Sequence, residues 1–163
     1  MKKGLVQLVI LSAIIYLQTN FLQQLAFKNV KPDLALIVLI YFSMTQTGSV
    51  ASGLGFFSGL LEDFASMSPL GFHSLIKTLV ALVSSRLGCF VSVDSVLFHA
   101  VTVGIATVVK YLSAAVLFSV FSIDRSTTPL IHTSFIIETL YNAILAPLVF
   151  IFINWIMKRF KRR

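Results

Sequence analysis

The chain has 163 residues, of which 57% are hydrophobic and only 12% are charged. A water-soluble domain is about half apolar and about a quarter charged, so this composition excludes an ordinary soluble globule and predicts a protein embedded in a bilayer. The net charge of +7 does not indicate nucleic-acid binding, because five of the basic residues follow the last apolar segment at the C-terminus. Such a run is typical of a cytoplasmic anchor beside anionic membrane lipid.

The apolar runs predict an all-α integral membrane protein with a single transmembrane domain over residues 1–163. A spanning helix needs about 20 residues, so the chain has room for about six. Residues 35–41 do not alternate in polarity as the strands of a membrane β-barrel do. The helices are predicted at about residues 5–27, 33–47, 49–65, 69–88, 95–121 and 131–157.

The first predicted helix, 5–27, follows Lys2 and Lys3 and is expected to remain as an uncleaved span. Its glutamines make one side polar, which favours packing against protein rather than lipid. The second and third runs are short for a bilayer core and meet at a tight turn over 45–49. They form either two short spans or a re-entrant pair, and both alternatives return the chain to the same side.

The placement of basic residues predicts the orientation of the helices. With the N-terminus inside, the inner side carries Lys2, Lys3, Arg86 and the five basic residues of the tail, and the outer side carries Lys28, Lys31 and Arg125. This excess on the inner side predicts that both termini are cytoplasmic and that the loop 122–130 is outside.

Ionisable side chains occur in or at the edges of the predicted spans: Glu62, Asp63, His73, Lys77, His99, Lys110 and Glu138. A charge at the bilayer centre costs about 3 kcal/mol, so each should face a partner or a cavity. Both a proton path and structural ion pairs are open interpretations. Lys77 and Glu138 lie at similar depth in their helices, which predicts an intramembrane ion pair between them.

Nothing in the sequence indicates catalysis, a cofactor or a metal site. The three histidines, His73, His99 and His132, fall on different predicted helices and have no second ligand four residues away. The single cysteine excludes an internal disulfide. No nucleophile elbow or phosphate-binding loop is present in the sequence. We therefore expect a protein that is not an enzyme.

A stripe of small residues runs along the third predicted helix. Ala51, Gly55 and Gly59 recur every four residues, and Asp63 is the next position on the same face. Small side chains let a second helix approach closely in a membrane. The partner is either a helix of this chain or a helix of another protein. Alanine at either glycine is expected to be milder than leucine.

Two blocks of residues resemble a known family. The first is Lys-Pro-Asp-Leu at 31–34, which runs into Ile-Val-Leu-Ile-Tyr-Phe at 37–42. The second is Gly-Phe-Phe-Ser-Gly-Leu-Leu-Glu-Asp at 55–63, followed by Ser-Pro-Leu-Gly-Phe-His-Ser-Leu at 68–75. In this order and at this spacing they resemble the rod shape-determining protein MreD family. The resemblance covers most of the chain, and the second block is the specific one.

The family pattern matches this chain residue by residue at Asp33, Gly59, Asp63, Pro69 and Gly71. Glu62 departs from the pattern, which is often apolar there, so either acid of the pair could be the important one. The resemblance implies a fold similar to the S component of energy-coupling-factor transporters.

The resemblance also implies a role in the bacterial inner membrane. Such a protein would be a non-enzymatic scaffold of the cell-elongation machinery (the elongasome), binding the single-span protein MreC and acting with the actin-like MreB. It would be linked to peptidoglycan synthesis through the elongation glycosyltransferase and a penicillin-binding transpeptidase. The alternative is a small-solute-binding S component of a transporter. Those proteins dock through an Ala-x-x-x-Ala pair on their first helix, whereas here Ala13 is followed by Leu17.

The expected partner or packing surface comprises the small stripe, its acidic end and the link to the fourth helix: Ala51, Gly55, Gly59, Glu62, Asp63, Pro69, Gly71 and His73. A single helix of an MreC-like partner would lie against it, or the chain's own first helix would fill it. On the first alternative, Asp63→Ala weakens the complex and leaves protein abundance near normal.

Overall fold

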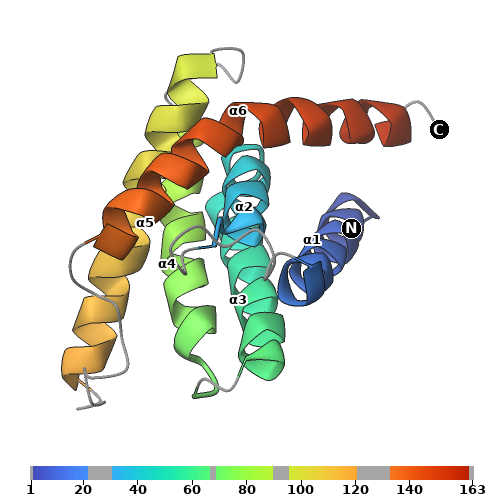
Figure 1. Cartoon of the computed structure of the whole chain (residues 1–163). Helices are drawn as coiled ribbons and strands as arrows, with labels where there is room; N and C mark the ends of the chain where they lie inside the picture. The colour runs from blue at the N-terminus through green and yellow to red at the C-terminus, as the bar shows by residue number, and fades with distance from the viewer. Residues whose placement is uncertain (1, 22–30, 67–68, 90–95, 121–132, 162–163) are drawn as a thin grey trace.

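The computed structural model describes residues 2–21, 31–66, 69–89, 96–120 and 133–161. Within these ranges the chain forms six helices and no strand, so the all-helical prediction is confirmed (Figure 1). The helices are α1 (Lys2–Phe21), α2 (Leu34–Met44), α3 (Gly48–Ala65), α4 (Phe72–Gly88), α5 (Val96–Val120) and α6 (Thr133–Lys161). The predicted loop 122–130, the end of the first predicted helix at 22–27 and His132 lie outside the described residues.

Helix α2 lies at the centre of the bundle. Every residue of 35–44 is buried, and each of the other five helices contacts α2. Asp33 caps its first turn by accepting a hydrogen bond from the backbone N–H of Leu36 at 3.0 Å. The eleven residues of α2 rise about 16 Å, about half of a bilayer core, so this helix is an internal element rather than a full span.

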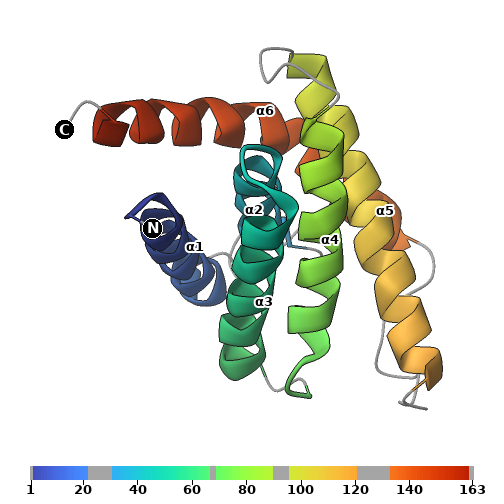
Figure 2. The same ribbon diagram turned by 180° about the vertical axis from the view of Figure 1, so that it is seen from behind.

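Helices α3 and α4 form an antiparallel hairpin and are the most extensively packed pair among the described helices (Figure 2). A Cβ atom added at Gly55 would lie 2.5 Å from the carbonyl oxygen of Lys77, and one at Gly59 would lie 2.5 Å from that of His73. The small stripe therefore packs against α4 within the chain, which is the internal alternative. Alanine is not a mild substitution there, because even one methyl group would overlap the backbone of α4.

Helix α6 bends near its middle, where it contains Pro147 (Figures 1 and 2). Proline has no N–H to donate to the carbonyl of Ala143 and displaces that carbonyl, which accounts for the bend. The first half of α6 packs along α5, and the second half runs across the end of the bundle towards the side where α1 lies. The sequence-based prediction of one helix over 131–157 does not include this change of direction.

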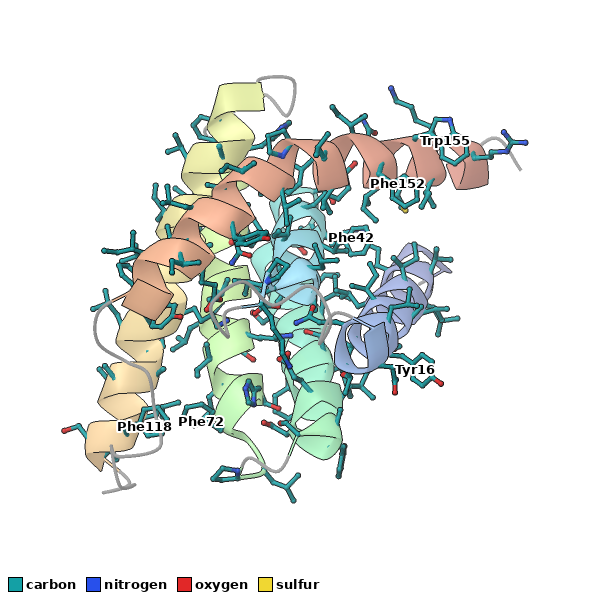
Figure 3. The ribbon with its side chains drawn as sticks, viewed as in Figure 1. Tyr16, Phe42, Phe72, Phe118, Phe152 and Trp155 are labelled. Atoms are coloured by element: carbon teal, nitrogen blue, oxygen red, sulfur yellow. The ribbon has the colours of Figure 1, made fainter. Side chains whose placement is uncertain are left out.

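Two described segments are long and apolar enough to cross a membrane, Phe98–Val120 in α5 and Phe135–Arg159 in α6. Both carry large apolar side chains on their outer faces, such as Leu112 and Ile144. Figure 3 shows the contrast with Phe42, which lies in the interior. Apolar side chains that cover an outer surface to this extent are suited to lipid rather than water.

Candidate functional site

The main polar site is a bridge between three helices, formed by a partly buried ammonium group and two buried carboxylates. The Nζ atom of Lys110, on α5, lies 2.7 Å from Asp33 Oδ2 and 2.7 Å from Glu138 Oε1 on α6. The Tyr111 hydroxyl donates to Glu138 Oε2 at 2.5 Å. The side-chain oxygen of Asn142 accepts the backbone N–H of Asp33 at 2.9 Å. One ammonium group thus joins the start of α2 to α5 and α6.

Helix α1 is joined to the same bridge through Gln18. Its side-chain NH₂ lies 3.4 Å from Asp33 Oδ1, and its side-chain oxygen accepts the backbone N–H of Ala35 at 2.9 Å. The carboxylate of Asp33 also faces the N-terminus of α2, where the helix dipole favours a negative charge. These hydrogen bonds offset the one carboxylate charge that Lys110 leaves uncompensated.

A second ion pair joins α3 to α4. Glu62 Oε2 lies 2.6 Å from Lys77 Nζ, and Lys77 is only 2% exposed. The two atoms are close enough for an ion pair but are not aligned as a hydrogen bond. The structure therefore differs from the predicted Lys77–Glu138 pair, since Lys77 pairs with Glu62 and Glu138 pairs with Lys110. Depth along a helix predicted the wrong partners because it ignores which way each side chain points around the helix.

Asp63 holds the start of α4 in place. Its carboxylate accepts the backbone N–H groups of Gly71 and His73, each at 2.9 Å, and the N–H and hydroxyl of Ser74 at 3.3 and 3.2 Å. The ring Nδ1 of His73 lies 2.9 Å from the same carboxylate. Gly71 has a φ of 95°, a left-handed conformation that favours glycine. Asp63 thus satisfies the free N–H groups at the N-terminus of α4, as a capping residue does.

The predicted site residues separate into an internal set and an outer set. Ala51, Gly55, Gly59 and Asp63 are buried against α4 and are not available to a partner. Glu62, His73 and Gly71 lie beside them in partly exposed positions, and Pro69 is exposed. The surface expected from the sequence is therefore mostly an interface within the chain.

The described residues contain no group of three or more histidine, cysteine, aspartate or glutamate side chains that could hold a metal ion. His73 lies with Asp63 at the start of α4, whereas the ring of His99 packs 4.5 Å from that of Phe150. His132 lies outside the described residues.

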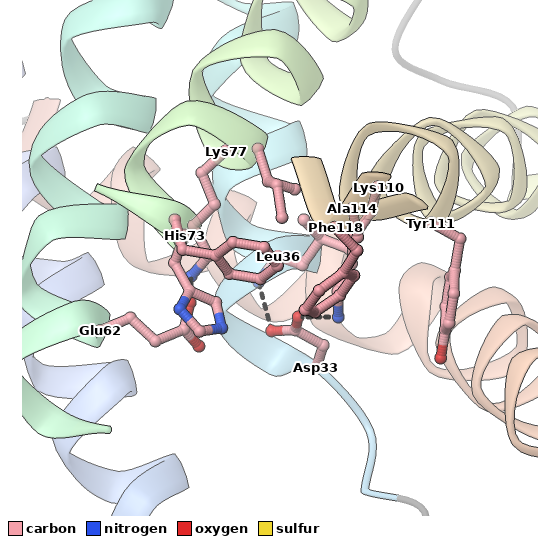
Figure 4. A pocket seen from close by; sticks show the side chains of 11 residues that line it. Asp33, Leu36, Glu62, His73, Lys77, Lys110, Tyr111, Ala114 and Phe118 are labelled. Carbon is pink, nitrogen blue, oxygen red and sulfur yellow. Dashed lines mark hydrogen bonds and ion pairs between the residues drawn. The ribbon is translucent and has the colours of Figure 1, made fainter. Parts of the chain in front are cut away.

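A cavity of about 300 Å³ lies between α2, α3, α4 and α5 (Figure 4). Both ion pairs border it, with Glu62 and Lys77 on one side and Asp33 and Lys110 on the other. The rest of its wall is mainly apolar and aromatic: Leu36, Phe72, Ile76, Tyr111, Ala114 and Phe118, together with His73. Figure 3 shows Phe72 and Phe118 close together at one end of the bundle, with ring centroids 5.0 Å apart.

Sequence analysis missed the bridging role of Asp33. It follows a proline at the first residue of the predicted helix 33–47, and the sequence indicates it only as a match to the family pattern, not as one of the ionisable groups of the spans. An acid immediately before a fully apolar run was the available signal, because such a residue caps the helix and enters the membrane core with it. The contributions of Gln18, Tyr111 and Asn142 carried no signal of comparable specificity.

The family model of the rod shape-determining protein MreD matches residues 2–156 of the chain. The matched range includes all the ion pairs described above. No curated protein and no solved structure shows a significant match.

Proposed function

Because the chain belongs to the MreD family of rod shape-determining membrane proteins, we propose that it is a non-enzymatic scaffold of the bacterial cell-elongation machinery. The observation that carries this proposal is the family match over residues 2–156. Its partners would be an MreC-like single-span protein, and indirectly MreB and the enzymes of peptidoglycan synthesis. The architecture supports a binding role, since the charges of the core pair with one another across the helices.

In this proposal the six helices form one domain of the inner membrane, with both termini in the cytoplasm. The count of basic residues supports that orientation, and the long apolar segments of α5 and α6 support the membrane location. The end of α3 and the start of α4 then face the periplasm.

The partner surface is placed at the link between α3 and α4, on residues other than the small stripe. Phe64 and Leu70 are each 70% exposed, and they flank this link. Asp63 accepts the N–H of Gly71 and so fixes the backbone next to Leu70, at the end of the link that the structure describes. Two large apolar side chains on a fixed backbone offer a partner helix contact area at little cost in conformational entropy.

The test is co-purification of the MreC-like partner from membranes in mild detergent, together with measurement of cell width. Replacing Phe64 and Leu70 with alanine should reduce the recovered partner at least about fivefold and widen the cells, while the abundance of the protein stays normal. The matched control replaces two exposed apolar residues of α6, Ile136 and Leu140, with alanine. Equal recovery of the partner in both double variants would refute this surface.

The cavity gives the solute-binding alternative one specific point of support, because its volume is in the range of a small-molecule site. The purified protein can be titrated with water-soluble vitamins by calorimetry. Tight binding of one of them, together with normal cell shape after loss of the protein, would replace the scaffold proposal with the transporter alternative.

A further inference from the structure

The second half of α6, residues 147–161, lies across the bundle rather than along it. Two opposite views show it running at a steep angle to α4, with the bend near Pro147 (Figures 1 and 2). We propose that this half-helix lies in the plane of the membrane, and that its basic end binds the phosphate groups of anionic phospholipid in the cytoplasmic leaflet. The inference rests on the membrane location and orientation of the proposed function, and it adds a lipid ligand to them.

Phe150 fixes the level of the half-helix in the bundle. Its ring centroid lies 5.1 Å from that of Tyr41 and 4.5 Å from that of His99. Tyr41 is three residues before the end of α2, and His99 is three residues after the start of α5. At 1.5 Å per residue, each lies about 5 Å from its helix end. Both of these ends are cytoplasmic in the proposed orientation, so the half-helix belongs to the cytoplasmic leaflet.

The half-helix is apolar on two opposite faces. Phe150 and Ile153 are buried against the bundle, whereas Leu148, Phe152 and Trp155 on the outer side are each more than half exposed. A helix resting on a water-covered surface would have a polar outer face. An apolar outer face is suited to acyl chains instead, so the half-helix lies among them, just below the head groups.

The basic groups of the half-helix gather at its far end. Lys158 and Arg159 are exposed, and no ion pair between described residues includes either of them. The guanidinium carbon of Arg159 lies 5.7 Å from the ring centroid of Trp155, close enough for a cation–π contact. Tryptophan prefers the level of the head groups, from which lysine and arginine reach the phosphates.

The partner is lipid rather than an acidic protein, because the apolar outer face keeps this basic end at the membrane surface. Each basic residue there strengthens attachment to anionic lipid by about fivefold.

The first test measures depth at two positions on the outer face. Leu148 and Trp155 are seven residues apart, nearly two turns, so they point the same way. Trp155 is the only tryptophan in the sequence, so its fluorescence reports on this position alone. The combined variant Trp155→Phe/Leu148→Trp moves the probe to position 148. In vesicles of phosphatidylcholine brominated at defined acyl carbons, both probes should be quenched most by the shallow bromines and should give the same depth.

A half-helix that crossed the membrane would place the probe at position 148 about 10 Å deeper than Trp155, since a helix rises 1.5 Å per residue. That result would overturn the in-plane arrangement. If Leu148→Trp does not yield folded protein, Ile151→Trp in the same Trp155→Phe background replaces it, because Ile151 is also exposed. A crossing half-helix would place that probe about 6 Å deeper than Trp155.

The second test measures which head group lies beside Trp155. The full chain is placed in vesicles of equal parts phosphatidylcholine and phosphatidylglycerol, with bromine on only one of the two lipids. Quenching should show a preference of at least about fivefold for phosphatidylglycerol. Lys158→Gln with Arg159→Gln should lower that preference by at least about threefold. The matched control, Lys28→Gln with Lys31→Gln, removes the same charge on the predicted outer side and should leave the preference unchanged.

Equal quenching by the two lipids, or an unchanged preference in Lys158→Gln/Arg159→Gln, would contradict the lipid site. Flotation of each sample separates these failures from a failure of the proposed function. A chain that does not float with the vesicles contradicts the membrane location, and this inference with it. A floating chain with a deep probe at position 148 contradicts this inference alone, and loss of the MreC-like partner contradicts the scaffold alone.

Discussion

Replacement of Gly59 by alanine tests the close contact between α3 and α4. The added Cβ would lie 2.5 Å from the carbonyl oxygen of His73, and side-chain carbons essentially never approach closer than 3.0 Å. Helix α4 must therefore retreat by at least 0.5 Å, the difference between these two distances. Overpacking of this kind lowers the free energy of unfolding by typically 1–3 kcal/mol. Because the neighbour is a backbone atom and cannot rotate away, we expect a loss of about 3 kcal/mol.

The matched control is Gly53→Ala on the same helix. A Cβ atom there meets nothing within 4 Å. The free energy of unfolding of this variant should therefore rise by about 0.5–1 kcal/mol from helix propensity alone. Because both variants share that gain, the difference between their melting temperatures isolates the packing cost and should be about 6–12 °C. The assay is thermal unfolding in one detergent, followed by loss of the monodisperse peak. Equal melting temperatures for the two variants would refute the close contact.

The remaining predictions concern the buried charges and the orientation. Lys110→Met strands two buried carboxylates and should lower the free energy of unfolding by about 3–5 kcal/mol in denaturant titration, with partial recovery when Glu138→Gln is added. Asp63→Ala removes the acceptor of the N–H groups that begin α4, so protein abundance by immunoblot should fall; normal abundance with weaker partner binding would contradict this internal role. A cysteine at Ser126, in a Cys89→Ser background, should react with a membrane-impermeant maleimide in intact cells, and protection there would reverse the proposed orientation.

The periodicity of small residues predicted one helix face correctly in position. Gly55 and Gly59 lie one above the other because a helix repeats every 3.6 residues, and this spacing is visible in any sequence. Which helix covers the face depends on how the helices turn and associate, and spacing within one helix has no information about that. The same limit explains Lys77, whose direction around α4 leads to Glu62 rather than to Glu138.

The boundaries and the bend of α6 show a second kind of limit. Helix α2 ends at Met44 and helix α4 begins at Phe72, in both cases several residues inside the predicted bounds. The reason is that Thr45 and Gly71 form turns, which hydropathy does not indicate. Pro147 was visible in the sequence, but a proline is tolerated within a membrane helix because neighbouring groups satisfy the freed backbone, so its presence alone does not give the direction of the second half. Its effect here depends on the packing of the first half of α6 against α5, which is tertiary information.

The acidic end of α3 has a consequence for how the protein enters the membrane during synthesis. Glu62 and Asp63 leave the ribosome before the groups that neutralise or bind them, all of which belong to α4 or to the link before it. Until α4 follows, α3 would carry two carboxylates into lipid alone, at a cost that falls only once the two helices meet. On the proposed multi-pass topology, the insertion machinery would therefore accept α3 and α4 together as a helical hairpin, and α3 by itself would not be a unit of membrane insertion.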